Sequence, residues 1–63
     1  MARKTLAKMF EDLYWLEKQA RDLYDGFLRD LPEESVRAVV TRIRDDEERH
    51  MRLAQQLIDL VTE

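Results

Sequence analysis

The stretch Arg44-Asp45-Asp46-Glu47-Glu48-Arg49-His50 decides how this chain is organised. Glu47 and His50 stand three positions apart, so on an α-helix their side chains lie on one face. Counting outward from this pair in alternating steps of three and four gives a series whose other members are all apolar. The series is Val36, Val40, Ile43, Glu47, His50, Ala54, Leu57 and Val61. A carboxylate and an imidazole therefore interrupt an apolar helical seam, where aliphatic side chains are expected.

The first half of the chain repeats this pattern, with Glu17 as the interruption. The series there is Leu6, Phe10, Leu13, Glu17, Ala20, Tyr24, Phe27 and Leu31. Burial of an unpaired carboxylate is costly unless it is protonated, paired with a cation or bound to a metal. If the chain folds back near Pro32, Glu17 lies level with residues 47–50. The sequence therefore predicts that one hairpin brings Glu17, Glu47 and His50 together.

The ligand types point to a metal shared by two chains. Di-iron and di-manganese bundles use one Glu from each of two helices and a Glu-x-x-His pair from each of the other two. A single hairpin offers half of that set in Glu17, Glu47 and His50. Two hairpins related by a two-fold axis would supply all of it, with iron, manganese or zinc as the candidate ions.

The fold class expected is all-α, an antiparallel two-helix hairpin that dimerises into a four-helix bundle. The chain has 63 residues, one Gly, one Pro and 40% charged residues, which fits one domain of long helices. We expect one helix over about 5–30, a turn over about 31–33 and a second helix over about 33–61. Gly26 falls inside the first helix, and Pro32 suits the first position of the second.

A third apolar position in each heptad predicts the dimer. With Glu17 and Glu47 at heptad position a, position g is also apolar, except for Asp46. The apolar members are Met9, Leu16, Leu23, Val39, Leu53 and Leu60. Three apolar residues per heptad are typical of a four-helix core, so an isolated hairpin would leave about half of this surface wet. The partner expected is a second copy of the chain, in a homodimer or a multiple of that dimer.

Three further residues stand close to this pattern. Asp46 lies one turn before His50, where its carboxylate can orient a metal-bound imidazole within the chain or across the dimer. Tyr24 follows Glu17 by two turns, so its hydroxyl can bond a ligand carboxylate, or its ring can simply fill the core. Trp15 is expected to point away from the other helix, either as a contact between dimers or as a lone exposed aromatic.

Composition excludes several functions. The chain has no cysteine, so it offers no disulfide, zinc–thiolate or rubredoxin-type iron site. Its net charge of −3, with both signs interspersed, gives no basic face for nucleic acid. No signal peptide or membrane-spanning segment is evident, so we expect a cytoplasmic protein with no membrane partner.

At these residues the chain resembles the ferritin-like superfamily. The stretch Asp45-Asp46-Glu47-Glu48-Arg49-His50 is similar to the Asp-Glu-x-x-His helix of bacterioferritins and rubrerythrins, and Glu17 with Tyr24 resembles the partner helix. The closer likeness is to encapsulated ferritins, whose short two-helix chains complete a ferroxidase site by pairing. The resemblance spans roughly residues 6–61.

The resemblance implies oxidation of Fe(II) by O2 at a di-iron site, in iron storage or detoxification. Glu17, Glu47 and His50 would be its metal-binding and catalytic residues. It also implies residence inside a protein compartment, although the shell-targeting tail of encapsulated ferritins is missing. Leu16 and Gln19 replace the acidic entry-site residues that this family carries beside the first Glu.

Two other interpretations stay open. In one, Glu17, Glu47 and His50 form a buried ionic layer that fixes the register of a natural or designed bundle. In the other, they bind a metal without redox chemistry. Metal content per chain, measured together with the oligomer mass, separates these interpretations from a ferroxidase.

Overall fold

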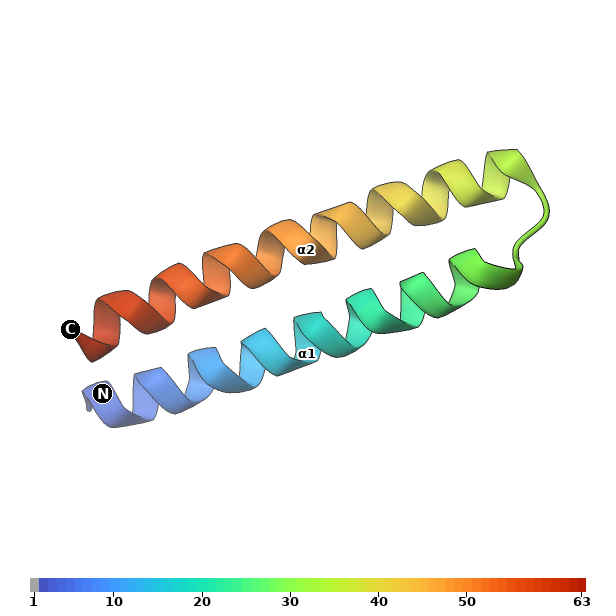
Figure 1. The fold of residues 1–63 in the computed structure, drawn as a ribbon. Helices are drawn as coiled ribbons and strands as arrows, with labels where there is room; N and C mark the ends of the chain where they lie inside the picture. The colour runs from blue at the N-terminus through green and yellow to red at the C-terminus, as the bar shows by residue number, and fades with distance from the viewer. Residues whose placement is uncertain (1) are drawn as a thin grey trace.

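Two long antiparallel helices make up the computed structural model, which describes residues 2–63 (Figure 1). Helix α1 spans Arg3–Asp30 and helix α2 spans Glu34–Thr62. The helices lie side by side with both termini at one end, and the hairpin measures 47 × 14 × 13 Å (Figure 1). The predicted all-α helical hairpin is confirmed.

The first helix begins earlier than expected because its start is held against the end of the second. The backbone N–H of Leu6 donates to the carbonyl of Ala2 at 3.1 Å, which closes the first turn of α1. The Arg3 guanidinium donates to the carbonyls of Leu60 and Val61, both at 3.3 Å. These carbonyls belong to the last turn of α2, where backbone acceptors have no partner within the helix. Arg3 therefore satisfies them and ties the two ends together.

The turn corrects the expected start of the second helix. Leu31 precedes a proline and takes an extended conformation, with φ −78° and ψ 115°, which ends α1. Pro32 lies in the turn rather than at the first helical position. Glu33 is also extended and caps α2 through its carbonyl, which accepts from the N–H of Arg37 at 2.9 Å. The second helix therefore begins at Glu34.

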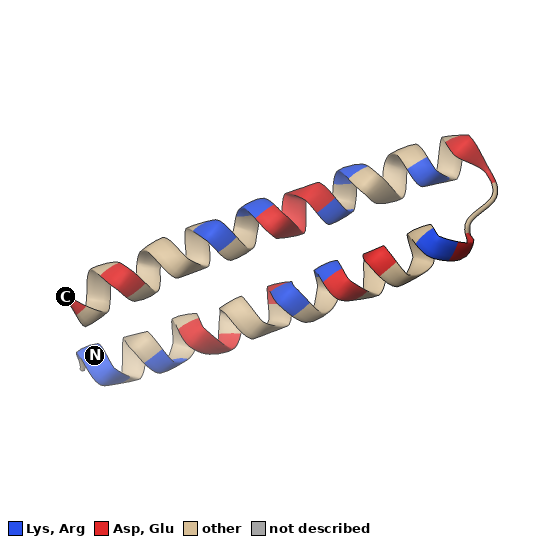
Figure 2. Cartoon of the chain, viewed as in Figure 1, with Lys and Arg blue, Asp and Glu red and all other residues tan. Residues whose placement is uncertain are grey.

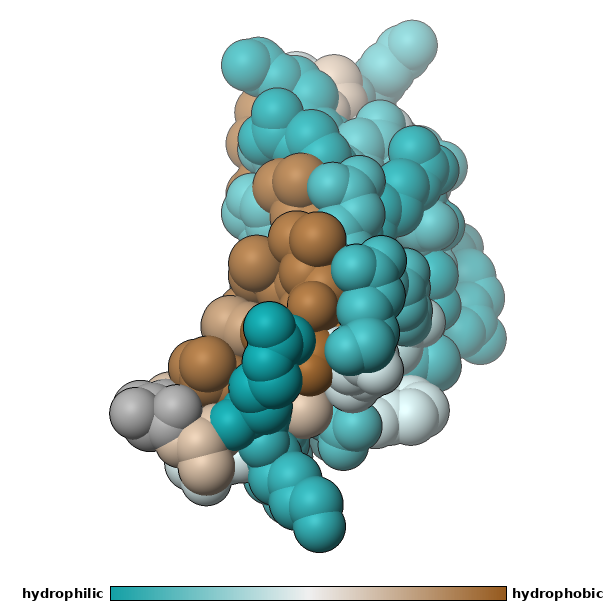
Figure 3. All heavy atoms as spheres, turned by 90° about the vertical axis from the view of Figure 1, so that its left-hand side faces the viewer, coloured by the Kyte–Doolittle hydropathy of each residue, from teal (hydrophilic) through white to brown (hydrophobic). Residues whose placement is uncertain are grey.

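A single hairpin buries little apolar surface. Among residues 2–63, the buried apolar side chains are Met51, 6% exposed, and Ala54, 1% exposed. Large apolar side chains remain open at heptad positions d and g of both helices, and we call this surface the front face. Its members are Met9, Leu13, Leu16, Leu23, Phe27, Val36, Val39, Ile43, Leu53, Leu57 and Leu60. Viewed end-on, apolar atoms gather on one side of the hairpin and hydrophilic atoms cover the other (Figure 3).

The helices meet mainly through heptad positions a and e. On α2, Ala54 occupies position a and Met51 occupies position e. The apolar seam predicted from the sequence comprises positions a and d, so its a residues lie in the helix contact and its d residues lie on the front face. Within residues 2–63, neither helix carries an apolar stretch long enough to cross a membrane.

Candidate metal centre

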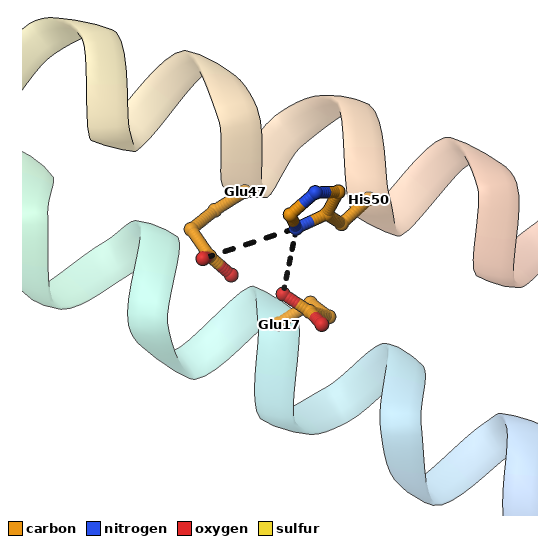
Figure 4. Close-up of side chains that lie close together, drawn as sticks. All are labelled: Glu17, Glu47 and His50. Carbon is orange, nitrogen blue, oxygen red and sulfur yellow. Dashed lines mark ion pairs between the residues drawn. The ribbon is translucent and has the colours of Figure 1, made fainter.

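Three potential ligands meet at mid-length of the hairpin (Figure 4). Glu17 comes from α1, and Glu47 and His50 come from α2. One ligand atom from each lies within 4.8 Å of the others. The Nδ1 atom of His50 is 3.5 Å from Glu17 Oε2 and 4.0 Å from Glu47 Oε1. Equal distance from the turn places Glu17 level with the Glu-x-x-His pair, as the sequence predicted.

The three side chains differ in their exposure. The carboxylates of Glu17 and Glu47 lie between the helices, where 20% and 19% of each side chain is exposed. The imidazole of His50 lies at the front face, with 44% of the side chain exposed. Leu13, Leu53 and neighbouring apolar residues form a groove of about 290 Å³ beside it. A single hairpin therefore shields the carboxylates and leaves the imidazole open.

The carboxyl group of Glu17 lies close enough to that of Glu47 to perturb its ionisation. Glu17 raises the pKa of Glu47 above its ordinary value, first through a hydrogen bond between the carboxyl groups, with desolvation and charge repulsion adding to it. His50 opposes this shift. A divalent cation competes with protons for these carboxylates, so metal binding at this centre should weaken as pH falls.

The donor atoms fit a metal ion. Two carboxylates and an imidazole supply oxygen and nitrogen ligands without sulfur, a set that suits iron, manganese and zinc. Three protein ligands leave further coordination positions for a second carboxylate, water or substrate. The group of Glu17, Glu47 and His50 can therefore hold a metal ion, and its donor types admit several metals.

Behind this centre lies a charged surface that sequence reasoning missed. The Arg21 guanidinium donates to Glu48 at 2.8 Å, and the Arg44 guanidinium donates to Asp25 at 2.8 Å. Arg44 also lies 3.9 Å from Glu48. We call this surface the back face; it includes a groove lined by Tyr14, Arg21, Glu48, Met51, Arg52 and Gln55. Figure 2 shows the alternating basic and acidic residues at mid-length of both helices.

The ion pairs on the back face shift the pKa values of their members. The hydrogen bond from Arg21 holds the pKa of Glu48 below its ordinary value. The hydrogen bond to Asp25 raises the pKa of Arg44. A sequence signal for these contacts existed, because each helix carries an arginine followed by an acid four residues later, and antiparallel packing sets the arginine of one helix against the acid of the other.

The remaining predicted site residues lie near the centre but do not join it within this chain. The Asp46 carboxylate is 3.5 Å from Arg49, and within residues 2–63 it forms no hydrogen bond or ion pair with His50. Tyr24 packs edge-on against Phe27, with ring centroids 6.2 Å apart. The roles of Asp46 and Tyr24 toward the ligands stay predictions, and for Asp46 a contact across a dimer is the remaining route.

Trp15 points away from the helix contact, as expected, with 56% of its surface exposed. It packs edge-on against Tyr14 at 5.6 Å, and the Lys18 ammonium lies 5.9 Å from its ring centroid. These contacts hold the indole against α1, and whether Trp15 also forms a contact between dimers stays a prediction.

Comparison of the chain with models of protein families, with curated proteins and with solved structures found no match. The functional interpretation of the centre therefore depends on its donor atoms, their spacing and the open face beside them. These features indicate that Glu17, Glu47 and His50 could hold a metal ion.

Proposed function

We propose that two copies of the chain pair through their front faces, about a two-fold axis, into a ferritin-like four-helix bundle. The open apolar surface supports this proposal, since it runs along both helices while the hairpin itself buries only Met51 and Ala54 among its described apolar residues. The hydrophobic core of a domain of this size supplies only a few kcal/mol of stability, so burial against a partner or a bound metal would add substantially to it. The second hairpin would cover the exposed imidazole of His50 along with the apolar side chains.

The pairing would complete a two-metal site. Each hairpin offers two carboxylates and one imidazole, so the pair offers four carboxylates and two imidazoles, the set used by di-iron bundles. Glu17, Glu47 and His50 of both chains would together hold the two ions. Metal binding would relieve the repulsion between the carboxylates of Glu17 and Glu47.

The function that we propose is that of a ferroxidase, with Fe(II) as substrate and O2 as oxidant. Two neighbouring Fe(II) ions can supply two electrons to one O2 molecule. The excess of carboxylates stabilises Fe(III) more than Fe(II), which favours electron loss. The single observation that carries this proposal is the convergence of Glu17, Glu47 and His50 at an open apolar face. Iron storage would require a larger assembly around the dimer, whereas detoxification would not.

The experiment adds two Fe(II) per dimer in air and follows Fe(III) absorbance. The parent should oxidise iron faster than buffer alone, and Glu17→Ala, Glu47→Ala and His50→Ala should fall to the buffer rate. Glu11→Ala is the matched control, because it removes an exposed carboxylate of α1 away from the centre. Equal rates in the parent, the three variants and buffer would reject the catalytic site.

A non-catalytic role is the second candidate. His50 Nδ1 lies 3.5 Å from Glu17, which is the geometry of an ionic layer that orders a bundle without redox chemistry. A metal-free dimer as stable as the loaded one would favour that role. Tight binding of Zn(II) without Fe(II) oxidation would favour a non-redox metal site.

A further inference from the structure

Two ion pairs on the back face link the helices one turn apart. They are Arg21 with Glu48 and Asp25 with Arg44, both at 2.8 Å. Arg21 and Asp25 stand four residues apart on α1, and Arg44 and Glu48 stand four residues apart on α2. We call these four residues the charge quartet. Within residues 2–63, the other ion pair that joins side chains of the two helices is Glu17 with His50.

The apolar pattern alone does not fix how far one helix slides along the other. Apolar residues recur every three or four positions on both helices, so a slide of one turn again places apolar residues opposite apolar residues. Such a slide would carry Glu17 away from Glu47 and His50. The short turn between Asp30 and Glu34 limits such a slide, because a slide would unwind a helix end there, and side-chain contacts at mid-length can add to this preference.

The charges of the quartet oppose a slide in either direction. A slide of one turn one way places Arg21 opposite Arg44. A slide the other way places Arg21 opposite Arg52 and Asp25 opposite Glu48. Like charges facing each other are unfavourable, and their cost rises when the groups are shielded from water, as Arg21 and Glu48 are at 20% and 28% exposed.

We propose that the charge quartet selects the helix register at which Glu17 faces Glu47 and His50. Arg21, Asp25, Arg44 and Glu48 are thus positioning residues that act through the register rather than by touching metal. The alternating order of charge along each helix is the essential feature, because it makes one register attractive and its neighbours repulsive. The consequence for metal binding rests on the proposed function, whereas the register is a property of the hairpin itself.

The decisive variant keeps the ion pairs but removes the alternation. Asp25→Arg combined with Arg44→Asp gives α1 two cations and α2 two anions. The native register stays paired, and each slid register gains an ion pair, between Arg21 and position 44 in one and between position 25 and Glu48 in the other. The matched variant adds Arg21→Glu and Glu48→Arg, which restores alternation with reversed signs. Exchange of the exposed Lys8 and Asp12 within α1 serves as a charge-swap control.

Two measurements follow register and site separately. Amide proton–nitrogen NMR spectra show one set of signals for one register and additional sets for a mixture. Titration with Co(II), followed by its visible absorption, reports whether the three ligands still converge. The parent, the reversed quartet and the control should show one set of signals and similar Co(II) affinity. The double variant should show additional sets and Co(II) binding about 10-fold weaker.

A double variant with one set of signals and the parent's Co(II) affinity would overturn the proposal. An unfolded double variant would also contradict it, because both ion pairs are kept and only the register should change. If the parent itself fails to bind Co(II), the proposed metal centre is wrong, and the amide spectra still decide whether the quartet selects the register.

Discussion

Glu47 and Glu48 are neighbours in the sequence, yet they meet opposite surroundings in the hairpin. Glu47 lies between the helices, at the border of the front face, and meets the carboxyl of Glu17, so its pKa is raised. Glu48 points toward the back face and accepts a hydrogen bond from Arg21, so its pKa is lowered. The back face gives its carboxylates cations, whereas the front face leaves its carboxylates beside one imidazole and apolar side chains. Carboxylates short of cations beside apolar surface are the ones expected to bind metal.

The same contrast appears in the apolar residues. The front face exposes apolar side chains along both helices, while hydrophilic atoms cover the other side of the hairpin (Figure 3). Ion pairs on the back face can be satisfied within one chain. The apolar side chains of the front face are not buried, and the carboxylates beside it have no cation other than the imidazole within the described chain. A second hairpin would bury these side chains, and a metal ion would balance the charge of the carboxylates.

The largest effect is expected from a charge placed on the front face. Leu53→Asp should abolish dimerisation, because it would put two unpaired carboxylates in the apolar interface, at a cost of about 3–5 kcal/mol. Arg52→Asp changes the adjacent residue, which lines the back face, and should leave the dimer intact. Sedimentation and thermal melting compare the two variants. If Leu53→Asp still sediments as the parent does, the front face is not the interface.

Metal should stabilise the front face selectively. Zn(II) at 100-fold above its dissociation constant should stabilise the folded dimer by about 2.7 kcal/mol, and a chelator should reverse this. The gain should be absent in His50→Ala, which lacks the imidazole, and retained in Asp12→Ala, which lacks an exposed acid of α1. Identical melting of apo and Zn(II)-treated parent would show that these carboxylates have another role.

A smaller effect is expected at Asp46, which contacts Arg49 in a single hairpin. If the partner chain brings this carboxylate to His50, Asp46→Ala should weaken metal binding by about 10–100-fold while leaving all ligands in place. Competition titration against a coloured chelator measures this change. Unchanged affinity would identify Asp46 as a solvated surface acid.

The smallest and sharpest contrast uses the two neighbouring glutamates in the apo protein. The raised pKa of Glu47 means that its contribution to stability is present below pH 4.5, the ordinary value, and is lost as pH rises through the folded-state pKa. Glu47→Gln should therefore melt a few degrees higher than the parent at pH 7 and similarly at pH 4.

Glu48→Gln should behave in the opposite way. The pKa of Glu48 is lowered, so its contribution is present above pH 4.5 and is lost as pH falls through the folded-state pKa. This variant should melt lower than the parent at pH 7. If both variants change the melting temperature at pH 7 in the same direction, the surroundings of Glu47 and Glu48 do not differ in their effect on a charged carboxylate.

The sequence predicted the hairpin because the helical pattern of apolar residues continues over a long stretch on each side of Pro32, which is the only strong interruption. The first helix begins two residues before the expected start, because this start depends on tertiary contacts. Arg3 donates hydrogen bonds to the carbonyls of Leu60 and Val61, and no local sequence pattern around Arg3 predicts this contact. The extended conformation of Glu33, which caps α2, likewise depends on how the turn closes.

The candidate site divides in the same way. Glu17, Glu47 and His50 were predictable because their distance from the turn sets their level along the hairpin. The pairing of Arg21 with Glu48 was missed, since charged residues beside a seam resemble an ordinary solvated face. The exposure of His50 could not be assigned from periodicity, because it depends on what covers the front face.

The most direct test of the central claim is the intact mass of the protein loaded with Fe(II) in the absence of O2. The claim is that paired hairpins hold two ions between them through Glu17, Glu47 and His50. Native mass spectrometry should show two chains, or a multiple of two, with one iron per chain. Glu47→Ala should remove the iron from this species. A single chain that carries its own iron, or a dimer that binds none, would contradict the account.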